Sequence, residues 1–202
     1  MTRLYVEEPF TLTAQTVVCL GFFDGVHIGH KRLVDRAKEI ARMEKLLVCV
    51  HTFATMPQLV LHPERPAFEL TTLSEKEALL SESGVDLLAV SRFTEDLMHM
   101  RAKDFFDAIL LCKLRARHIV VGFHHRFGYK GEMDAKGLSK LCEEAGIGLS
   151  VIKPVRLPDG SLVSSSAIRF CLAKGEWDKA EAMLGRKIGC EGTVEQTRYR
   201  YS

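Results

Sequence analysis

The sequence lacks the features that mark membrane and secreted proteins. No apolar run approaches the ~20 residues that a membrane-spanning helix needs. The first ten residues, MTRLYVEEPF, contain two glutamates and no apolar core of the kind that a secretory signal carries. We therefore expect a cytoplasmic location and no membrane partner.

Neither charge nor cysteine is concentrated in a way that indicates a special partner. The chain has 28 basic and 26 acidic residues and a net charge of +2, which gives no electrostatic reason to expect a nucleic-acid partner. Its six cysteines form no CxxC pair, and most lie inside apolar stretches. We interpret them as reduced, buried side chains rather than as zinc ligands or disulfides.

The sequence does contain a regular alternation of short apolar runs with amphipathic segments. Five apolar runs predict strands, at residues 17–20, 46–50, 87–90, 118–122 and 149–155. The segments between them predict helices, and a capping box at Ser74–Glu77 is expected to open one of these. Continuous apolar strands joined by helices are typical of a parallel sheet that is covered on both faces. The expected fold is therefore α/β, a Rossmann-like, doubly wound, parallel five-stranded sheet with helices on both faces.

Two glycine-rich segments follow predicted strands. LGFFDGVHIGH, residues 20–30, comes at the end of the first strand, and VGFHHRFGYKGEMD, residues 121–134, comes at the end of the fourth. In open parallel sheets, ligands bind beyond the carboxyl ends of the strands, at the point where the strand order reverses. We therefore expect the two segments to form one site.

The first of these segments has three interpretations. His27 and His30 could bind a metal, but zinc needs three or four ligands and no Cys or His partner lies at a customary spacing. They could be structural histidines on a loop. They could also bind phosphate, because the glycines permit close approach and a helix that starts near Gly29 offers free N–H groups. The segment matches neither the Walker loop nor GxGxxG. The pattern favours phosphate bound by histidine and leaves the other two interpretations open.

Four motifs in order carry a resemblance to a known family. The H-x-G-H pattern resembles the signature of the nucleotidylyltransferase superfamily, and GFFDGVHIGH is similar to the FAD synthetase (FMN adenylyltransferase) module of bacterial bifunctional riboflavin kinase/FAD synthetases. VVGFHHRFG, VSSSAIR and KGEWDKAEAMLGR resemble three further motifs of that module. The resemblance covers residues 15 to 187, approximately the whole chain.

This resemblance implies a reaction and a set of site residues. The reaction is transfer of AMP from ATP to FMN, giving FAD and pyrophosphate by in-line attack without a covalent enzyme intermediate. The implied cofactor is Mg²⁺, held mainly by ATP, and no protein metal ligand is assigned. The implied catalytic residues are His27, His30 and Arg169. ATP binding is implied for these three and for Gly21, Phe22, Asp24, Gly25, Ser164, Ser165 and Ser166. Flavin binding is implied for Pro57, His124, Arg126 and Phe127.

The sequence departs from the family pattern at three points. His124 stands where the family usually has Asp or Asn, and Thr55-Met56-Pro57 stands where it has P-H-P. The P-T-A-N motif of the riboflavin kinase module is absent. We therefore expect a nucleotidylyltransferase domain at residues 1–187. Residues 188–202 are expected to be a tail, either a remnant of that kinase module or the end of a stand-alone enzyme.

Two alternative functions follow from these departures. The chain could be another HxGH nucleotidylyltransferase with a different phosphorylated acceptor. It could also be a non-catalytic module that binds flavin or nucleotide. The oligomeric state is not indicated by the sequence.

Overall fold

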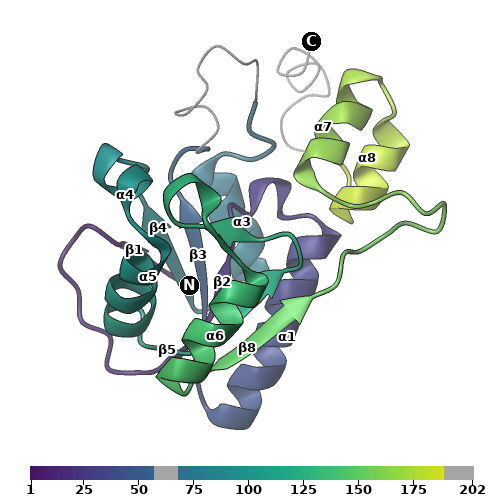
Figure 1. Ribbon diagram of the computed structural model, residues 1–202. Helices are drawn as coiled ribbons and strands as arrows, with labels where there is room; N and C mark the ends of the chain where they lie inside the picture. The colour runs from purple at the N-terminus through teal and green to yellow at the C-terminus, as the bar shows by residue number, and fades with distance from the viewer. Residues whose placement is uncertain (57–67, 189–202) are drawn as a thin grey trace.

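A six-stranded parallel sheet forms the centre of the computed structural model, which describes residues 1–56 and 68–188 (Figure 1). The strand order is β1-β4-β3-β2-β5-β8, and every neighbouring pair is parallel. The strands are β1 (Thr2–Tyr5), β2 (Thr16–Leu20), β3 (Leu47–Phe53), β4 (Leu87–Ser91), β5 (Ala116–Gly122) and β8 (Gly148–Ile152). The α/β class and the parallel sheet are confirmed.

Helices cover both faces of this sheet. They are α1 (Ile28–Glu44), α3 (Leu73–Glu82), α4 (Glu95–His99), α5 (Ala102–Asp104), the π-helical η2 (Phe105–Lys113) and α6 (Ala135–Ala145). Two further helices, α7 (Ser165–Ala173) and α8 (Trp177–Leu184), lie beyond the sheet. Short elements complete the description: the 3₁₀ turns η1 (Asp24–Val26) and η3 (Tyr129–Gly131) and the antiparallel pair β6 (Arg126–Phe127) and β7 (Met133–Asp134).

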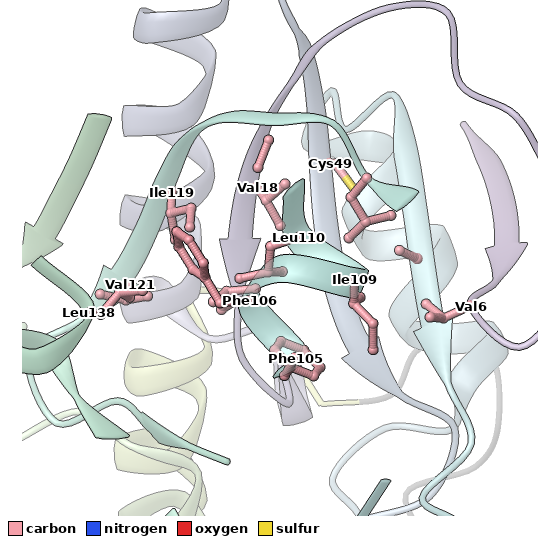
Figure 2. Close-up of a cluster of buried hydrophobic side chains, with 14 of the residues drawn as sticks. Val6, Val18, Cys49, Phe105, Phe106, Ile109, Leu110, Ile119, Val121 and Leu138 are labelled. Atoms are coloured by element: carbon pink, nitrogen blue, oxygen red, sulfur yellow. The ribbon is translucent and has the colours of Figure 1, made fainter. Parts of the chain in front are cut away.

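The sheet is doubly wound, because from β2 onward the strand order runs outward toward both edges, and alternate residues of its strands face two different cores. Val18 and Leu20 of β2 pack with η2 and α6 in one cluster (Figure 2). Val17 and Cys19 pack with α1 and α3 in the other. A third cluster joins α7 to α8, which lie together beyond the sheet, and includes Leu70. Because the central strands are buried on both faces, they read as continuous apolar runs in the sequence.

Two details of the expected fold are wrong. The sheet has six strands rather than five, because TRLY forms β1 at the edge beside β4. This edge strand is half exposed and needs no continuous apolar run, so its sequence gave little signal. The capping box also lies two residues earlier than predicted. The Thr72 hydroxyl accepts the N–H of Glu75, and the Glu75 carboxylate accepts the N–H of Thr72. Ser74 therefore lies inside α3.

The structure also bears on the expectations for the cysteines, the C-terminal tail and membrane-spanning helices. Five cysteines are free thiols, four of them buried, and Cys190 lies outside the described residues. Apart from residue 188, the predicted tail at 188–202 also lies outside them. No helix in residues 1–56 and 68–188 is long and apolar enough to cross a membrane.

Candidate active site

The two glycine-rich segments meet at one edge of the sheet. They follow β2 and β5, which are hydrogen-bonded neighbours. The strand order reverses between these two strands, since β3, β4 and β1 lie on one side and β8 on the other. The structure therefore brings the two segments together at the switch point of the sheet.

His27 and His30 stack at the start of α1. Their ring centroids lie 3.6 Å apart with an interplanar angle of 13°. His27 is the N-cap of the helix, and its Nδ1 accepts the backbone N–H of His30 at 3.3 Å. A neutral imidazole that accepts at Nδ1 carries its proton on Nε2. His27 thus has an Nε2–H donor at a helix N-terminus, where anions bind.

Burial keeps both imidazoles neutral. It lowers the pKa of His27 to about 4, and the charge of Arg186 acts in the same direction. Burial lowers the pKa of His30 well below its usual value, with smaller contributions from His27 and Lys76. The buried Nδ1 of His30 has no hydrogen-bond partner within residues 1–56 and 68–188. A bound phosphate would raise both pKa values, because a nearby negative charge favours the imidazolium form.

The loop before the histidines has an unusual backbone. Phe23, Gly25 and Val26 have φ values of 54°, 76° and 39°. Such values are rare for a β-branched residue and mark local strain that the surroundings must hold. The position of Gly25 favours glycine for two reasons, because its φ of 76° is strained for other residues and a Cβ would lie 2.9 Å from the Leu70 side chain. The strained conformation of this loop therefore depends on contacts with other elements.

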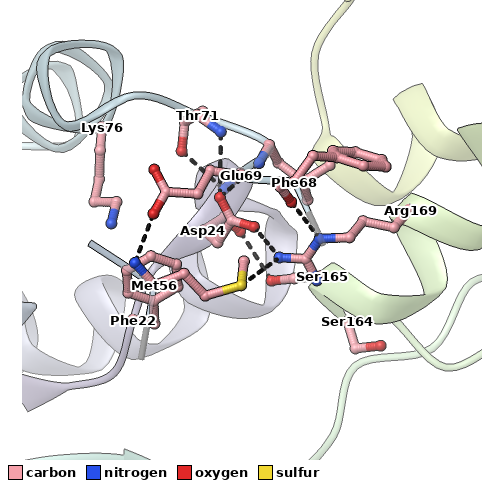
Figure 3. A network of polar contacts seen from close by, with 12 residues as sticks. Phe22, Asp24, Met56, Phe68, Glu69, Thr71, Lys76, Ser164, Ser165 and Arg169 are labelled. Atoms are coloured by element: carbon pink, nitrogen blue, oxygen red, sulfur yellow. Dashed lines mark hydrogen bonds and ion pairs between the residues drawn. The ribbon is translucent and has the colours of Figure 1, made fainter. Parts of the chain in front are cut away.

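Asp24 provides the main anchor of this loop (Figure 3). Its Oδ1 accepts the backbone N–H groups of Leu70 at 2.8 Å and Thr71 at 3.2 Å. Its Oδ2 pairs with Arg169 of α7, whose Nε donates to the Phe68 carbonyl at 2.7 Å. The Asp24 side chain is 1% exposed, and burial raises its pKa against the opposing charge of Arg169. The ion pair thus joins the loop, residues 68–71 and α7.

Two further contacts hold the same loop. The Gly25 N–H donates to the Thr71 hydroxyl at 3.0 Å, and Arg186 donates to the Gly25 carbonyl at 2.7 Å. The Ser165 hydroxyl donates to the Asp24 carbonyl at 2.9 Å. Segments that lie 46 to 161 residues further along the chain therefore fix the residues that precede His27.

The predicted ATP-binding residues differ in their positions and contacts. Gly21, Phe22, Asp24, Gly25, Ser165 and Arg169 are gathered around the loop that leads to the histidine pair. Ser164 caps α7 by accepting the N–H of Ala167, and Ser166 is exposed. Asp24 points into the protein, and Arg169 is engaged with Asp24 and a backbone carbonyl. Their contacts with ATP stay predictions.

Sequence reasoning missed Lys76 and Arg186. Lys76 is 2% exposed, its Nζ lies 3.3 Å from the Thr52 hydroxyl, and burial lowers its pKa to about 8. Its spacing could have indicated that it is buried, because Lys76 lies four residues before the buried Leu80 and therefore on the same face of the helix. Arg186 lay within a motif that the resemblance covered, but its bond to Gly25 joins residues 161 apart.

A cavity of about 600 Å³ opens at the same edge of the sheet. Its aromatic lining residues are Phe53, Phe93, Phe105, Phe127 and Tyr129, and its histidines are His51, His99 and His125. Arg126 and Phe127, predicted for flavin, line it, whereas the exposed His124 does not. Pro57 lies outside the described residues. Leu20 and Gly21 also line the cavity, so it adjoins the loop that leads to His27.

A metal site made by protein side chains finds no support in this geometry. Within residues 1–56 and 68–188, no group of three or more His, Cys, Asp or Glu side chains is arranged to hold an ion. Of the three interpretations of the first glycine-rich segment, the geometry favours phosphate, because a donor pair lies at a helix N-terminus.

Comparison with known sequences gives one family. A family model described as FAD synthetase matches residues 10–167. A Listeria monocytogenes protein named bifunctional riboflavin kinase/FMN adenylyltransferase is 34% identical over 199 residues, which cover 96% of this chain and 62% of that protein. An Escherichia coli protein of the same name is 33% identical over 178 residues, which cover 88% of this chain and 56% of that protein. The chain thus spans less than two thirds of the length of these relatives.

Solved structures share the fold. A Streptococcus pneumoniae protein, described as a macrolide-efflux protein, superposes with a TM-score of 0.78 at 27% identity, over 92% of this chain and 62% of that one. A pantoate-beta-alanine ligase from Francisella tularensis superposes with a TM-score of 0.53 at 15% identity, over 94% of this chain and 78% of that one. At that identity the second likeness concerns the fold alone.

Proposed function

The chain belongs to the FAD synthetase family, and from this membership we propose that it transfers the AMP group of ATP to FMN, giving FAD and pyrophosphate. One observation supports this most directly. The stacked His27–His30 pair, at the N-terminus of α1, adjoins an aromatic cavity of about 600 Å³ through Leu20 and Gly21. A helix N-terminus suited to phosphate and a cavity suited to a flat ring system therefore adjoin at one edge of the sheet, which supports a reaction between two nucleotides.

The chemistry needs positioning rather than a protein nucleophile. A phosphate oxygen of FMN attacks the α-phosphorus of ATP in line, the bond from that phosphorus to the bridging oxygen breaks, and pyrophosphate leaves with the electron pair. The His27 Nε2–H donates to a phosphate oxygen of ATP. Because phosphate charge raises the pKa of a neighbouring imidazole, this interaction strengthens as negative charge develops on the leaving group.

Mg²⁺ belongs to this proposal as a companion of ATP. Mg²⁺ is usually bound by substrate phosphates with few protein ligands, so the phosphates of ATP would hold it here. When bound, it would supply positive charge that offsets the negative charge of the pyrophosphate group. Arg169, Ser164, Ser165 and Ser166 are proposed to contact the nucleotide from α7.

The aromatic cavity is proposed to take the fused ring of FMN. Its walls are mostly apolar and aromatic, which suits a planar ring that stacks. Arg126 and Phe127 contribute to these walls. The flavin roles of Pro57 and His124 stay predictions.

An assay of FAD formation tests the proposal. The chain is incubated with ATP, FMN and Mg²⁺, and FAD and pyrophosphate are quantified. Replacing His30 with alanine should lower kcat by about 100-fold or more, because a positioned charge-stabilising donor is lost. His118→Gln is the matched control, since His118 lies toward the other end of β5 and contacts Ser150.

Two outcomes would contradict the assignment. Turnover with another phosphorylated acceptor but not with FMN would identify a different HxGH nucleotidylyltransferase. Tight binding of ATP or FMN without turnover, whichever divalent ion is supplied, would identify a non-catalytic binding module.

A further inference from the structure

Lys76 is a buried cation, and within residues 1–56 and 68–188 no carboxylate lies within ion-pair distance of its ammonium group. Its side chain is 2% exposed on α3, and an ammonium group has three N–H donors. In the part of the chain that the structure describes, its hydrogen-bond acceptor is the Thr52 hydroxyl at 3.3 Å. Its other close contact is the ring of Phe22, whose centroid lies 3.8 Å from Nζ. A methionine could fill this space without the cost of removing a charge from water, so the charge calls for an explanation.

The contacts of Lys76 all lead to the loop before the histidines. The Thr52 hydroxyl, which Lys76 contacts, donates to the Phe22 carbonyl at 2.7 Å. Lys76 therefore holds Phe22 by its ring directly and by its carbonyl through Thr52. Phe23 follows with a φ of 54°, and its ring packs 4.7 Å from that of His30. A short chain of contacts thus joins the ammonium to the histidine pair.

The titratable neighbours of Lys76 come from three other segments. Asp24 of η1 and Glu69 favour its charged form, whereas burial opposes it. On α1, His30 experiences the Lys76 charge, which lowers the pKa of that imidazole. Figure 3 shows Lys76 reaching down from α3 toward Phe22, on the side of Asp24 where Glu69 lies. The cation therefore acts on the loop and on His30 together.

We propose that Lys76 is a positioning residue for nucleotidyl transfer, whose ammonium holds Phe22 and the left-handed turn that follows it, so that His27 and His30 face the ATP phosphates. This inference rests on the proposed function for its kinetic part. Lys76 contacts no substrate in this account. It acts through Phe22, Thr52 and the loop backbone, and its charge adds to the burial that lowers the pKa of His30.

The kinetic test compares Lys76→Met, Lys76→Arg and Lys38→Met. Lys38 also ties α3 to α1, since it donates to the Ser83 carbonyl at 2.8 Å, but it lies far along α1 from the histidines. We expect Lys76→Met to lower kcat by about 30-fold or more with a change in the KM for ATP of about threefold or less. Lys76→Arg should recover much of this loss, and Lys38→Met should behave as the parent chain.

The pH profile separates a positioning charge from simple packing. Burial lowers the pKa of Lys76 to about 8, so the active, charged form is lost as the pH rises through that value. The parent chain should therefore lose kcat above pH 8. Lys76→Arg should keep its activity to higher pH, and Lys76→Met should show no such decline. A Lys76→Met variant that melts earlier but keeps the parent kcat and the same alkaline decline would overturn the proposal.

A measurement without turnover keeps this test apart from that of the proposed function. Amide resonances of residues 21–30 and ring resonances of both histidines are recorded for the parent, Lys76→Met and Lys38→Met chains. We expect Lys76→Met alone to shift them. Unchanged resonances in Lys76→Met would overturn the inference even if FAD is formed. If the parent chain makes no FAD, the proposed function fails, and shifted resonances would still support the role of Lys76 in holding the loop.

Discussion

Lowering the pH from 7.5 to 5.0 should strongly destabilise the fold, because several buried imidazoles are held neutral. Burial lowers the pKa of His27 and His125 to about 4 and that of His51 to about 3. In the unfolded chain these groups return to an ordinary value near 6.5, so between about pH 6.5 and pH 4 the unfolded state binds more protons than the native state. Stability is therefore complete above pH 6.5 and is lost as the pH falls.

The size of the effect follows from the same values. His27, with a pKa of about 4 in the native state, should lower the free energy of unfolding by about 2 kcal/mol between pH 7.5 and pH 5.0. His51, with a pKa of about 3, should lower it by a similar amount. His125 is partly exposed, so its share is about 1–2 kcal/mol. Together the three should lose about 5 kcal/mol, a large part of the 5–15 kcal/mol that holds a typical domain. His30 acts in the same direction, whereas Asp24, whose pKa is raised, opposes it.

Urea unfolding at several pH values measures this loss. The variant His125→Phe tests how much of the pH-dependent loss of stability comes from one residue. Phenylalanine keeps the stacking on Phe127 and removes no hydrogen bond, because the buried Nε2 of His125 has no partner among the described residues. This variant should lose about 1–2 kcal/mol less than the parent between pH 7.5 and 5.0. Phe105→Leu is the control, since it removes packing but no titrating group and should lower stability equally at both pH values. Equal pH dependence in the parent and His125→Phe would refute the reasoning.

Three further predictions concern single residues whose contacts or backbone geometry stabilise the fold. Asp24→Ala should lower the free energy of unfolding by about 3–5 kcal/mol, measured by urea titration, because it removes the acceptor of two backbone N–H groups together with the partner of Arg169; a loss below ~1 kcal/mol would show that Asp24 does not anchor the loop in solution. Gly128→Ala should destabilise by about 2 kcal/mol or more in thermal unfolding, because Gly128 has a φ of 78° and its Cβ would lie 2.5 Å from Ala102; an unchanged Tm would contradict this backbone geometry. Thr72→Ala should cost about 1 kcal/mol by removing the N-cap of α3, whereas Thr72→Ser should cost almost nothing, and equal losses would argue against the cap.

The order of elements and the place of the site could be predicted because both depend on local pattern. Strands β2 and β5 are buried on both faces, so their apolar runs identify them without knowledge of their partners. The glycine-rich segments follow these strands directly, and general rules for parallel sheets then place them at one edge. Edge strand β1 was not predicted, because a half-exposed strand has no continuous apolar run.

Which of two adjacent histidines faces the cavity could not be predicted. In an extended segment the side chains of His124 and His125 would point to opposite sides, but residues 123–124 form a turn, which the sequence pattern did not reveal. The turn closed by the His125 N–H and the Gly122 carbonyl at 2.9 Å sets the choice, and His125 lines the cavity. The resemblance had drawn attention to His124 instead.

The sequence by itself determined the parallel α/β sheet, the helix that begins at the histidine pair, and the two loops that meet at the switch point, since periodicity and glycine act over a few neighbouring residues. Only the tertiary structure decided that Asp24 pairs with Arg169, 145 residues away, and that the Lys76 ammonium packs over the Phe22 ring. The physical reason is that a charge can be buried only where distant segments supply its partners, and one helix face does not reveal what it packs against. The groups that hold the nucleotide loop are therefore set by packing between segments that are remote in the chain.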